Sequence, residues 1–111
     1  MKRLDPVYVA SGGFLGAVLR WSVGVAVPGA AGTLVVNIVG SFVLGLLVTL
    51  VTDHRTRIFV GTGLLSSFTT YSTFAVETAA LGVTMGAVNV GANYALGFAA
   101  AGAGIVVGAR R

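Results

Sequence analysis

Residues 61–77 of this chain read GTGLLSSFTTYSTFAVE, and seven of the eight positions from Ser66 to Thr73 carry a hydroxyl group. The flanking residues are apolar enough to lie in a membrane. Lipid offers no hydrogen-bond partner, so hydroxyls at that depth must face protein, water or an ion. Serine and threonine are also weak helix formers. The segment therefore predicts a membrane helix that is broken near the bilayer midplane, with its polar groups directed at an ion.

The composition of the whole chain is that of an integral membrane protein. Of its 111 residues, 56% are hydrophobic and 9% are charged, whereas a soluble domain usually carries about 25% charged residues. So few charges cannot solvate a globular surface. The chain has no cysteine, which excludes disulfides and thiolate metal sites.

Four hydrophobic segments predict an all-α fold with one four-helix membrane domain over residues 1–111. The expected spans are residues 7–27, 33–52, 58–81 and 87–109. A turn at 27–32 leads to Thr33, the expected N-cap of the second span. A charged loop at 53–57 and an uncharged linker at 82–86 separate the later spans. Because four short helices cannot easily enclose a pathway, we expect a dimer.

The basic residues are distributed unevenly between the two sides that four spans define. Six of the seven lie at the chain ends or in the 53–57 loop: Lys2, Arg3, Arg55, Arg57, Arg110 and Arg111. The positive-inside rule therefore predicts a multi-pass protein of the cell membrane with both termini cytoplasmic. The basic character reflects topology, so no nucleic-acid partner is expected. Arg20, inside the first span, is expected to reach the interface or to pair with polar groups in the bundle.

Asparagines recur at helical spacing within the predicted spans. Asn37 and Ser41 lie four residues apart in the second span, and Asn89, Asn93 and Gly97 repeat at the same interval in the fourth. Such amides either join helices by hydrogen bonds or act as donors along an ion path. The spacing alone leaves both interpretations open.

Two aromatic residues and one acid follow the hydroxyl cluster. Tyr71 and Phe74 are three residues apart, so they either pack as ordinary aromatics or present positive ring edges to an anion. Glu77 is the only acid inside a predicted span, and it either has a function or reaches the interface. His54 is expected to be solvated. The sequence contains no catalytic constellation, so we do not expect an enzyme.

Three stretches of the chain resemble motifs of one known family, the Fluc (CrcB) fluoride channels. They are GGFLGAVLRW (residues 12–21), GTLVVNIVGSF (residues 32–42) and FTTYSTFAVE (residues 68–77). The resemblance covers nearly the whole chain. It implies an antiparallel dimer with narrow pores through which fluoride leaves the cell by passive flow. It also implies a structural sodium ion at the dimer interface.

The resemblance assigns roles to particular residues of this chain. It implies that Asn37 is the pore amide and that the ring edges of Tyr71 and Phe74 face fluoride. Ser66 and Thr69 would bind sodium through their backbone carbonyls. The other implied fluoride-path residues are Thr70, Ser72, Asn89 and Asn93, and the implied vestibule or structural residues are Arg20 and Glu77. The chain departs from the family at Ser66-Ser67, where Gly-Gly is usual, and at Tyr71, where Phe is usual.

The charge bias raises the question of the second subunit. An antiparallel homodimer requires one chain to insert in both orientations, which the strong bias opposes. The partner is therefore either an identical chain or a paralogue of opposite orientation. The alternative function is a non-conducting or partner-dependent subunit of a heterodimeric fluoride channel. A four-span drug transporter is disfavoured because the first predicted span has no acid.

Overall fold

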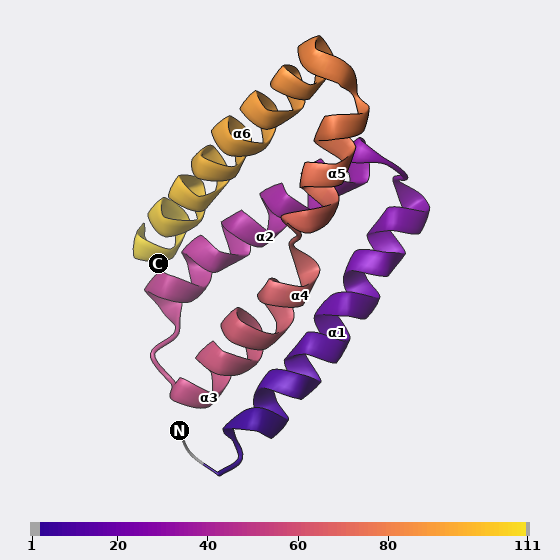
Figure 1. Cartoon of the computed structure of the whole chain (residues 1–111). Coiled ribbons are helices and arrows are strands. Elements are labelled where there is room, and N and C mark those ends of the chain that lie inside the picture. The colour runs from indigo at the N-terminus through magenta and orange to yellow at the C-terminus, as the bar shows by residue number, and fades with distance from the viewer. Residues whose placement is uncertain (1–2, 111) are drawn as a thin grey trace.

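The computed structural model describes residues 3–110, and the regular elements in that range are all helical (Figure 1). In chain order they are α1 (Asp5–Ala26), α2 (Ala30–Leu50), α3 (His54–Arg57), η1 (Ile58–Leu65), α4 (Ser66–Phe68), α5 (Ser72–Ala80) and α6 (Gly82–Arg110). We call the run from α3 through α5 the third segment. The predicted all-α fold is confirmed for the described residues.

Successive segments run in opposite directions, and α1 and α6 lie on opposite sides of α2 and the third segment (Figure 1). The main packing pairs are α1 with η1 and α2 with α6. Among the described residues, α1, α2 and α6 are long and apolar enough to cross a membrane. The chain is therefore a multi-pass membrane protein.

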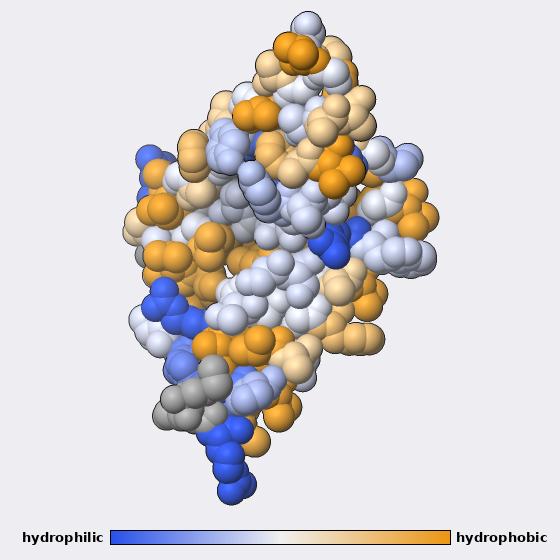
Figure 2. All heavy atoms as spheres, viewed as in Figure 1, coloured by the Kyte–Doolittle hydropathy of each residue, from blue (hydrophilic) through white to orange (hydrophobic). Residues whose placement is uncertain are grey.

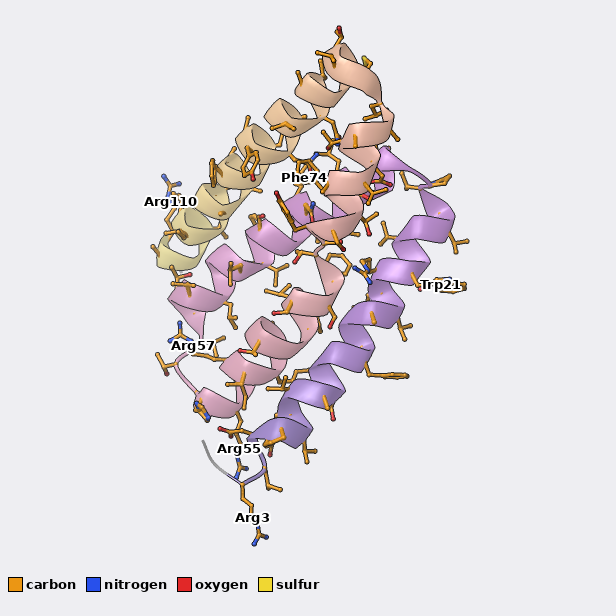
Figure 3. The ribbon with its side chains drawn as sticks, viewed as in Figure 1. Arg3, Trp21, Arg55, Arg57, Phe74 and Arg110 are labelled. Carbon is orange, nitrogen blue, oxygen red and sulfur yellow. The ribbon has the colours of Figure 1, made fainter. Side chains whose placement is uncertain are left out.

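Many large apolar side chains are exposed on the outside of the helical bundle. Large side chains such as Phe14 and Trp21 are 73% and 70% exposed, and Trp21 points away from the bundle (Figure 3). Hydrophobic residues are spread widely over the face in Figure 2. In a membrane protein such a surface faces lipid or another subunit.

Basic side chains gather at one end of the bundle. Arg3, Arg55, Arg57 and Arg110 all lie at the end that holds both termini (Figures 1 and 3). This grouping matches the pattern from which the sequence predicts a charged side. The other two residues in that pattern, Lys2 and Arg111, lie outside the described residues.

Two glycine turns differ from the sequence expectation. The expected linker at 82–86 is helical, because Gly82 has a φ of 84° and reverses the chain at the start of α6. Gly29, with a φ of 78°, occupies the N-cap position of α2. The prediction that Thr33 caps this helix is therefore wrong. Thr33 lies inside α2 and is buried.

The charged loop is also shorter than the sequence predicts, because α3 begins at His54. The Asp53 carboxylate caps this helix by accepting hydrogen bonds from the Thr56 N–H (3.0 Å) and hydroxyl (2.9 Å). These two bonds hold the pKa of Asp53 below its ordinary value. His54, expected only to be solvated, lies with its Nε2 3.0 Å from Oδ2 of the buried Asp5. This contact joins the third segment to the start of α1.

Glycines allow the main helix pairs to approach closely. A Cβ added to Gly12 or Gly16 of α1 would collide with the backbone oxygen of Phe59 or Leu64. On the other side of the bundle, a Cβ added to Gly104 of α6 would collide with the Phe42 carbonyl of α2. Backbone contact of this kind is a usual way for membrane helices to associate.

Candidate functional site

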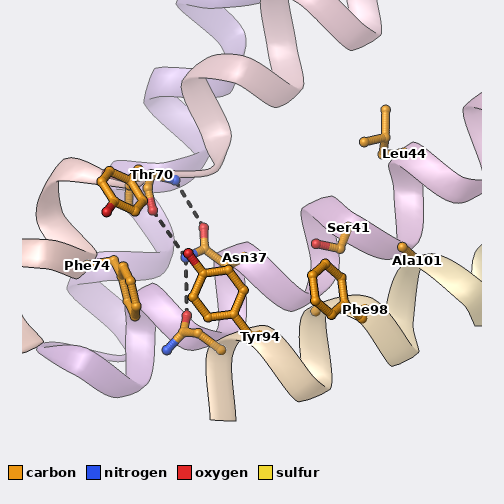
Figure 4. Close-up of a pocket in the computed structure, with 11 residues that line it drawn as sticks. Asn37, Ser41, Leu44, Thr70, Phe74, Tyr94, Phe98 and Ala101 are labelled. Atoms are coloured by element: carbon orange, nitrogen blue, oxygen red, sulfur yellow. Dashed lines mark hydrogen bonds between the residues drawn. The ribbon is translucent and has the colours of Figure 1, made fainter. Parts of the chain in front are cut away.

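A groove of about 330 Å³ lies between α2, α5 and α6, beside the gap between α4 and α5 (Figure 4). Its lining consists of Asn37, Ser41, Leu44, Thr70, Tyr71, Phe74, Asn93, Tyr94, Gly97, Phe98 and Ala101. These side chains offer neutral hydrogen-bonding groups and aromatic rings, and none carries a formal charge. The groove is therefore polar at a few points within an apolar wall.

The side chain of Asn37 fills the gap between α4 and α5. Helix α4 ends at Phe68, Thr69 has extended backbone angles (φ −79°, ψ 162°), and α5 begins at Ser72. Asn37 Oδ1 accepts a hydrogen bond from Thr70 N (3.0 Å), and Asn37 Nδ2 donates to Thr70 O (3.1 Å). One amide thus satisfies both polar groups of a residue that the helix does not pair.

Asn37 also begins a run of hydrogen bonds that crosses the bundle. Its Nδ2 donates to Asn93 Oδ1 (3.3 Å), and Asn93 Nδ2 donates to the Asn89 backbone oxygen (2.8 Å) and Oδ1 (3.2 Å). Asn89 Nδ2 then donates to Thr78 Oγ1 (2.9 Å). We call the five residues that these bonds join the amide chain: Thr70, Asn37, Asn93, Asn89 and Thr78. The hydrogen-bonding role expected of the asparagines is present, and their role in an ion path stays a prediction.

Four aromatic rings line one side of the groove in succession. The Tyr71 and Phe74 ring centroids are 5.9 Å apart, and Phe74 meets Tyr94 edge to face at 6.3 Å. Tyr94 and Phe98 follow at 5.9 Å. Sequence reasoning missed Tyr94 and Phe98. The available signal was their position one residue after Asn93 and Gly97, which places them beside the same helix face.

Arg20 and Glu77 both line a second cavity of about 290 Å³, to which Thr70 also contributes. The hydroxyl residues Thr33 and Thr73 share its lining. Glu77 Oε1 is buried and has no hydrogen-bond partner within residues 3–110. Thr70 contributes to both cavities. Ser72, in contrast, is exposed and lines neither of them.

Backbone oxygens near the gap have lost their helical donors. In a continuous helix, Ser66 O would accept from the N–H of residue 70 and Thr69 O from that of residue 73. Thr70 N donates instead to Asn37, and Thr73 N donates to Thr70 Oγ1 (3.2 Å). No group of three or more His, Cys, Asp or Glu residues suited to a metal occurs among the described residues. A cation here would therefore rely on neutral oxygens, and the two carbonyls fit that requirement.

Comparison with known proteins adds an independent line of evidence. The model of the family described as "CrcB-like protein, Camphor Resistance (CrcB)" matches residues 7–105. The Fluoride-specific ion channel FluC 1 of Natronomonas pharaonis is 51% identical over 107 residues, which cover 90% of each chain. FluC 2 of Halobacterium salinarum is 49% identical and is matched over 90% of this chain and 80% of its own. FluC 1 of the same organism is 53% identical over 68% of this chain and 66% of its own.

Proposed function

Because this chain belongs to the CrcB family, we propose that it is a fluoride-selective ion channel. The observation that carries the proposal is the groove beside Thr70, whose lining combines amide and hydroxyl groups with aromatic rings and has no charged member. The relatives named as fluoride-specific channels add support across most of the chain.

The chemistry of this groove suits a small, strongly hydrated anion. A selective pore must replace the water around the ion with donors from the protein and must exclude larger ions by its width. The hydroxyl groups of the groove lining can supply such donors, and the edges of the Phe74 and Tyr94 rings carry partial positive charge. Neutral donors also bind weakly enough for the ion to leave. Fluoride is therefore the anion that we assign to the groove.

Flow through the channel is passive, and the electrochemical gradient of fluoride, to which the membrane potential contributes, sets its direction. Moving one elementary charge through 100 mV changes its free energy by about 2.3 kcal/mol. A negative cell interior consequently drives a monovalent anion outward. The channel lowers cytoplasmic fluoride without an energy source of its own, and it catalyses no chemical reaction.

We also propose a structural sodium ion at the backbone carbonyls of Ser66 and Thr69. The support is the diversion of the Thr70 and Thr73 N–H groups to other acceptors. Carbonyls freed at a helix break coordinate sodium in other membrane proteins. Serine at position 66 is compatible with this role because the ligand is a backbone oxygen.

The functional unit that we propose is an antiparallel dimer whose second subunit is a paralogue of opposite orientation. Halobacterium salinarum has two relatives, named FluC 1 and FluC 2. Together with the basic end of this bundle (Figure 3), this favours a chain of fixed orientation over one that inserts both ways. The corresponding second candidate function is a subunit that conducts only with its partner.

A tag at each terminus tests the orientation directly. We expect accessibility assays on intact cells and on inverted vesicles to place both termini in the cytoplasm for essentially all molecules. Neutralising Arg55 and Arg57 together should produce a mixed population, because that change removes part of the charge bias. Equal populations of the two orientations in the wild-type protein would contradict the heterodimer proposal.

Purified protein in liposomes tests the proposed function. We expect vesicles that contain this chain and a paralogue of opposite charge bias to release loaded fluoride rapidly to a fluoride electrode and to retain loaded chloride. Fluoride release from vesicles that contain this chain alone would show that one chain type is sufficient. The proposal of a selective fluoride channel would be contradicted if neither preparation released fluoride, or if fluoride and chloride were released equally.

A further inference from the structure

The amide chain includes all three asparagines of the protein, and the sequence contains no glutamine. Every side-chain amide in the molecule is therefore part of one hydrogen-bonded path. The path starts at Thr70, passes through α2 and α6, and returns to the third segment at Thr78 on α5. Two positions of the third segment, one in the gap and one near the end of α5, are thus connected through two other helices.

The direction of these hydrogen bonds is fixed by the backbone of Thr70. Because Thr70 N can only donate and Thr70 O can only accept, Asn37 must present Oδ1 to the first and Nδ2 to the second. The Nδ2 group of Asn37 then faces Asn93, so Asn93 must accept this hydrogen bond with its Oδ1. The same reasoning orients Asn93 toward the oxygens of Asn89 and leaves the Asn89 nitrogen facing Thr78.

Thr78 is the acceptor on which this directed path ends. Its hydroxyl oxygen lies 2.9 Å from Asn89 Nδ2. The two residues meet because α6 starts directly after α5 and because Gly86 has no side chain. A Cβ on Gly86 would lie 2.9 Å from the Thr78 backbone oxygen and 3.5 Å from its Cγ2. The close approach of the two helices therefore places the hydroxyl where the last amide requires an acceptor.

We propose that Thr78 is a positioning residue for the groove, holding the Asn89 amide and, through Asn89 and Asn93, the orientation of Asn37 against Thr70. A hydroxyl outside the groove lining thereby acts on a side chain inside it. The positioning follows from the hydrogen bonds alone, whereas its consequence for ion flow rests on the proposed function.

Nuclear magnetic resonance offers a direct test, because three asparagines and no glutamine give three pairs of side-chain amide signals. The samples are the full chain in detergent micelles as wild type, Thr78→Val, Thr78→Ser and Thr84→Val. We expect Thr78→Val to change the chemical shifts of all three amide pairs, and we expect Thr78→Ser to leave these shifts near their wild-type values. Thr84 is exposed on α6, and we expect the Thr84→Val control to move none. Movement of the Asn89 pair alone would overturn the proposal.

Hydrogen exchange in the wild-type protein keeps the test decisive if Thr78→Val does not fold. The amide nitrogens of Asn37 and Asn93 each donate to two acceptors, whereas Asn89 donates to one among the described residues. We expect the Asn37 and Asn93 pairs to exchange about threefold to tenfold more slowly than the faster hydrogen of Asn89. Equal, rapid hydrogen exchange of all three side-chain amides would contradict a continuous hydrogen-bonded path through the amide chain.

Flux measurements separate positioning from folding. We expect Thr78→Val to lower fluoride release per active vesicle by about threefold to tenfold and to leave the fraction of active vesicles unchanged. A loss confined to the active fraction would indicate a purely structural role and overturn the proposal. If the wild-type protein, with or without a paralogue, releases no fluoride, the proposed function fails. The amide spectra still decide whether Thr78 positions Asn37.

Discussion

Replacing Asn37 with leucine is expected to reduce fluoride release from liposomes by at least about a hundredfold. The substitution keeps a side chain branched at Cγ but leaves Thr70 N, Thr70 O and Asn93 Oδ1 without their partner. A buried polar group that loses its partner costs about 1–3 kcal/mol, and these three groups are part-buried, so the lower end of that range applies to each. Three such losses amount to about 3 kcal/mol or more, and about 1.4 kcal/mol corresponds to a factor of ten.

The matched control for this experiment is Val48→Leu on the same helix. Val48 is 53% exposed and lies outside the groove lining. The control introduces the same residue without removing a hydrogen bond, so we expect release within about twofold of wild type. If Asn37→Leu releases fluoride at a rate within threefold of wild type, Asn37 is not required for fluoride to pass through the groove.

The sequence predicted the all-α fold because apolar composition and length alone are sufficient for that conclusion. It also selected Asn37, Thr70, Asn89 and Asn93, which the structure brings into one hydrogen-bonded path. The pairing itself could not be predicted. Helical spacing indicates which residues share a face, but it does not indicate which faces of different helices meet. Asn37 and Thr70 are 33 residues apart and meet only through tertiary packing.

The errors have a common origin in backbone geometry. The sequence predicted a linker at 82–86, but a single residue with positive φ, Gly82, makes the turn. The sequence predicted Thr33 as a cap from its residue type, but Gly29 occupies that position. The contact between His54 and Asp5 was missed because it joins two residues 49 positions apart. In each case the composition was compatible with several backbone paths.

The arrangement of the site explains why a break in the third segment and a polar second span belong together. A helix that stops at Phe68 exposes the N–H and C=O groups of Thr70, and lipid cannot satisfy them. Asn37 satisfies both from the neighbouring helix. The bond from Thr70 N to Asn37 also removes the helical donor of Ser66 O, while Thr73 N, the helical donor of Thr69 O, bonds to Thr70 Oγ1. One amide therefore connects the groove with the proposed sodium site.

Substituting valine for Gly104 is expected to lower the stability of the folded chain substantially. A Cβ at this position would overlap the Phe42 carbonyl oxygen and lie 3.1 Å from Gly45 Cα. Both neighbours are backbone atoms of α2, so the helices must separate along their main contact. Overpacking of a tight interface costs typically about 1–3 kcal/mol, and backbone that cannot yield places this case at the upper limit. For a chain of this size, that cost lowers the melting temperature by about 10–20 °C.

Gly102→Val is the control that isolates packing from helix propensity. Gly102 lies two residues earlier on α6, and nothing comes within 4 Å of a Cβ built there. Valine is a slightly better helix former than glycine, so we expect this variant to melt within a few degrees of wild type. Circular dichroism in micelles measures both transitions on a single subunit. Equal losses in the two variants would mean that the α2–α6 contact is not held by the absence of a side chain at Gly104.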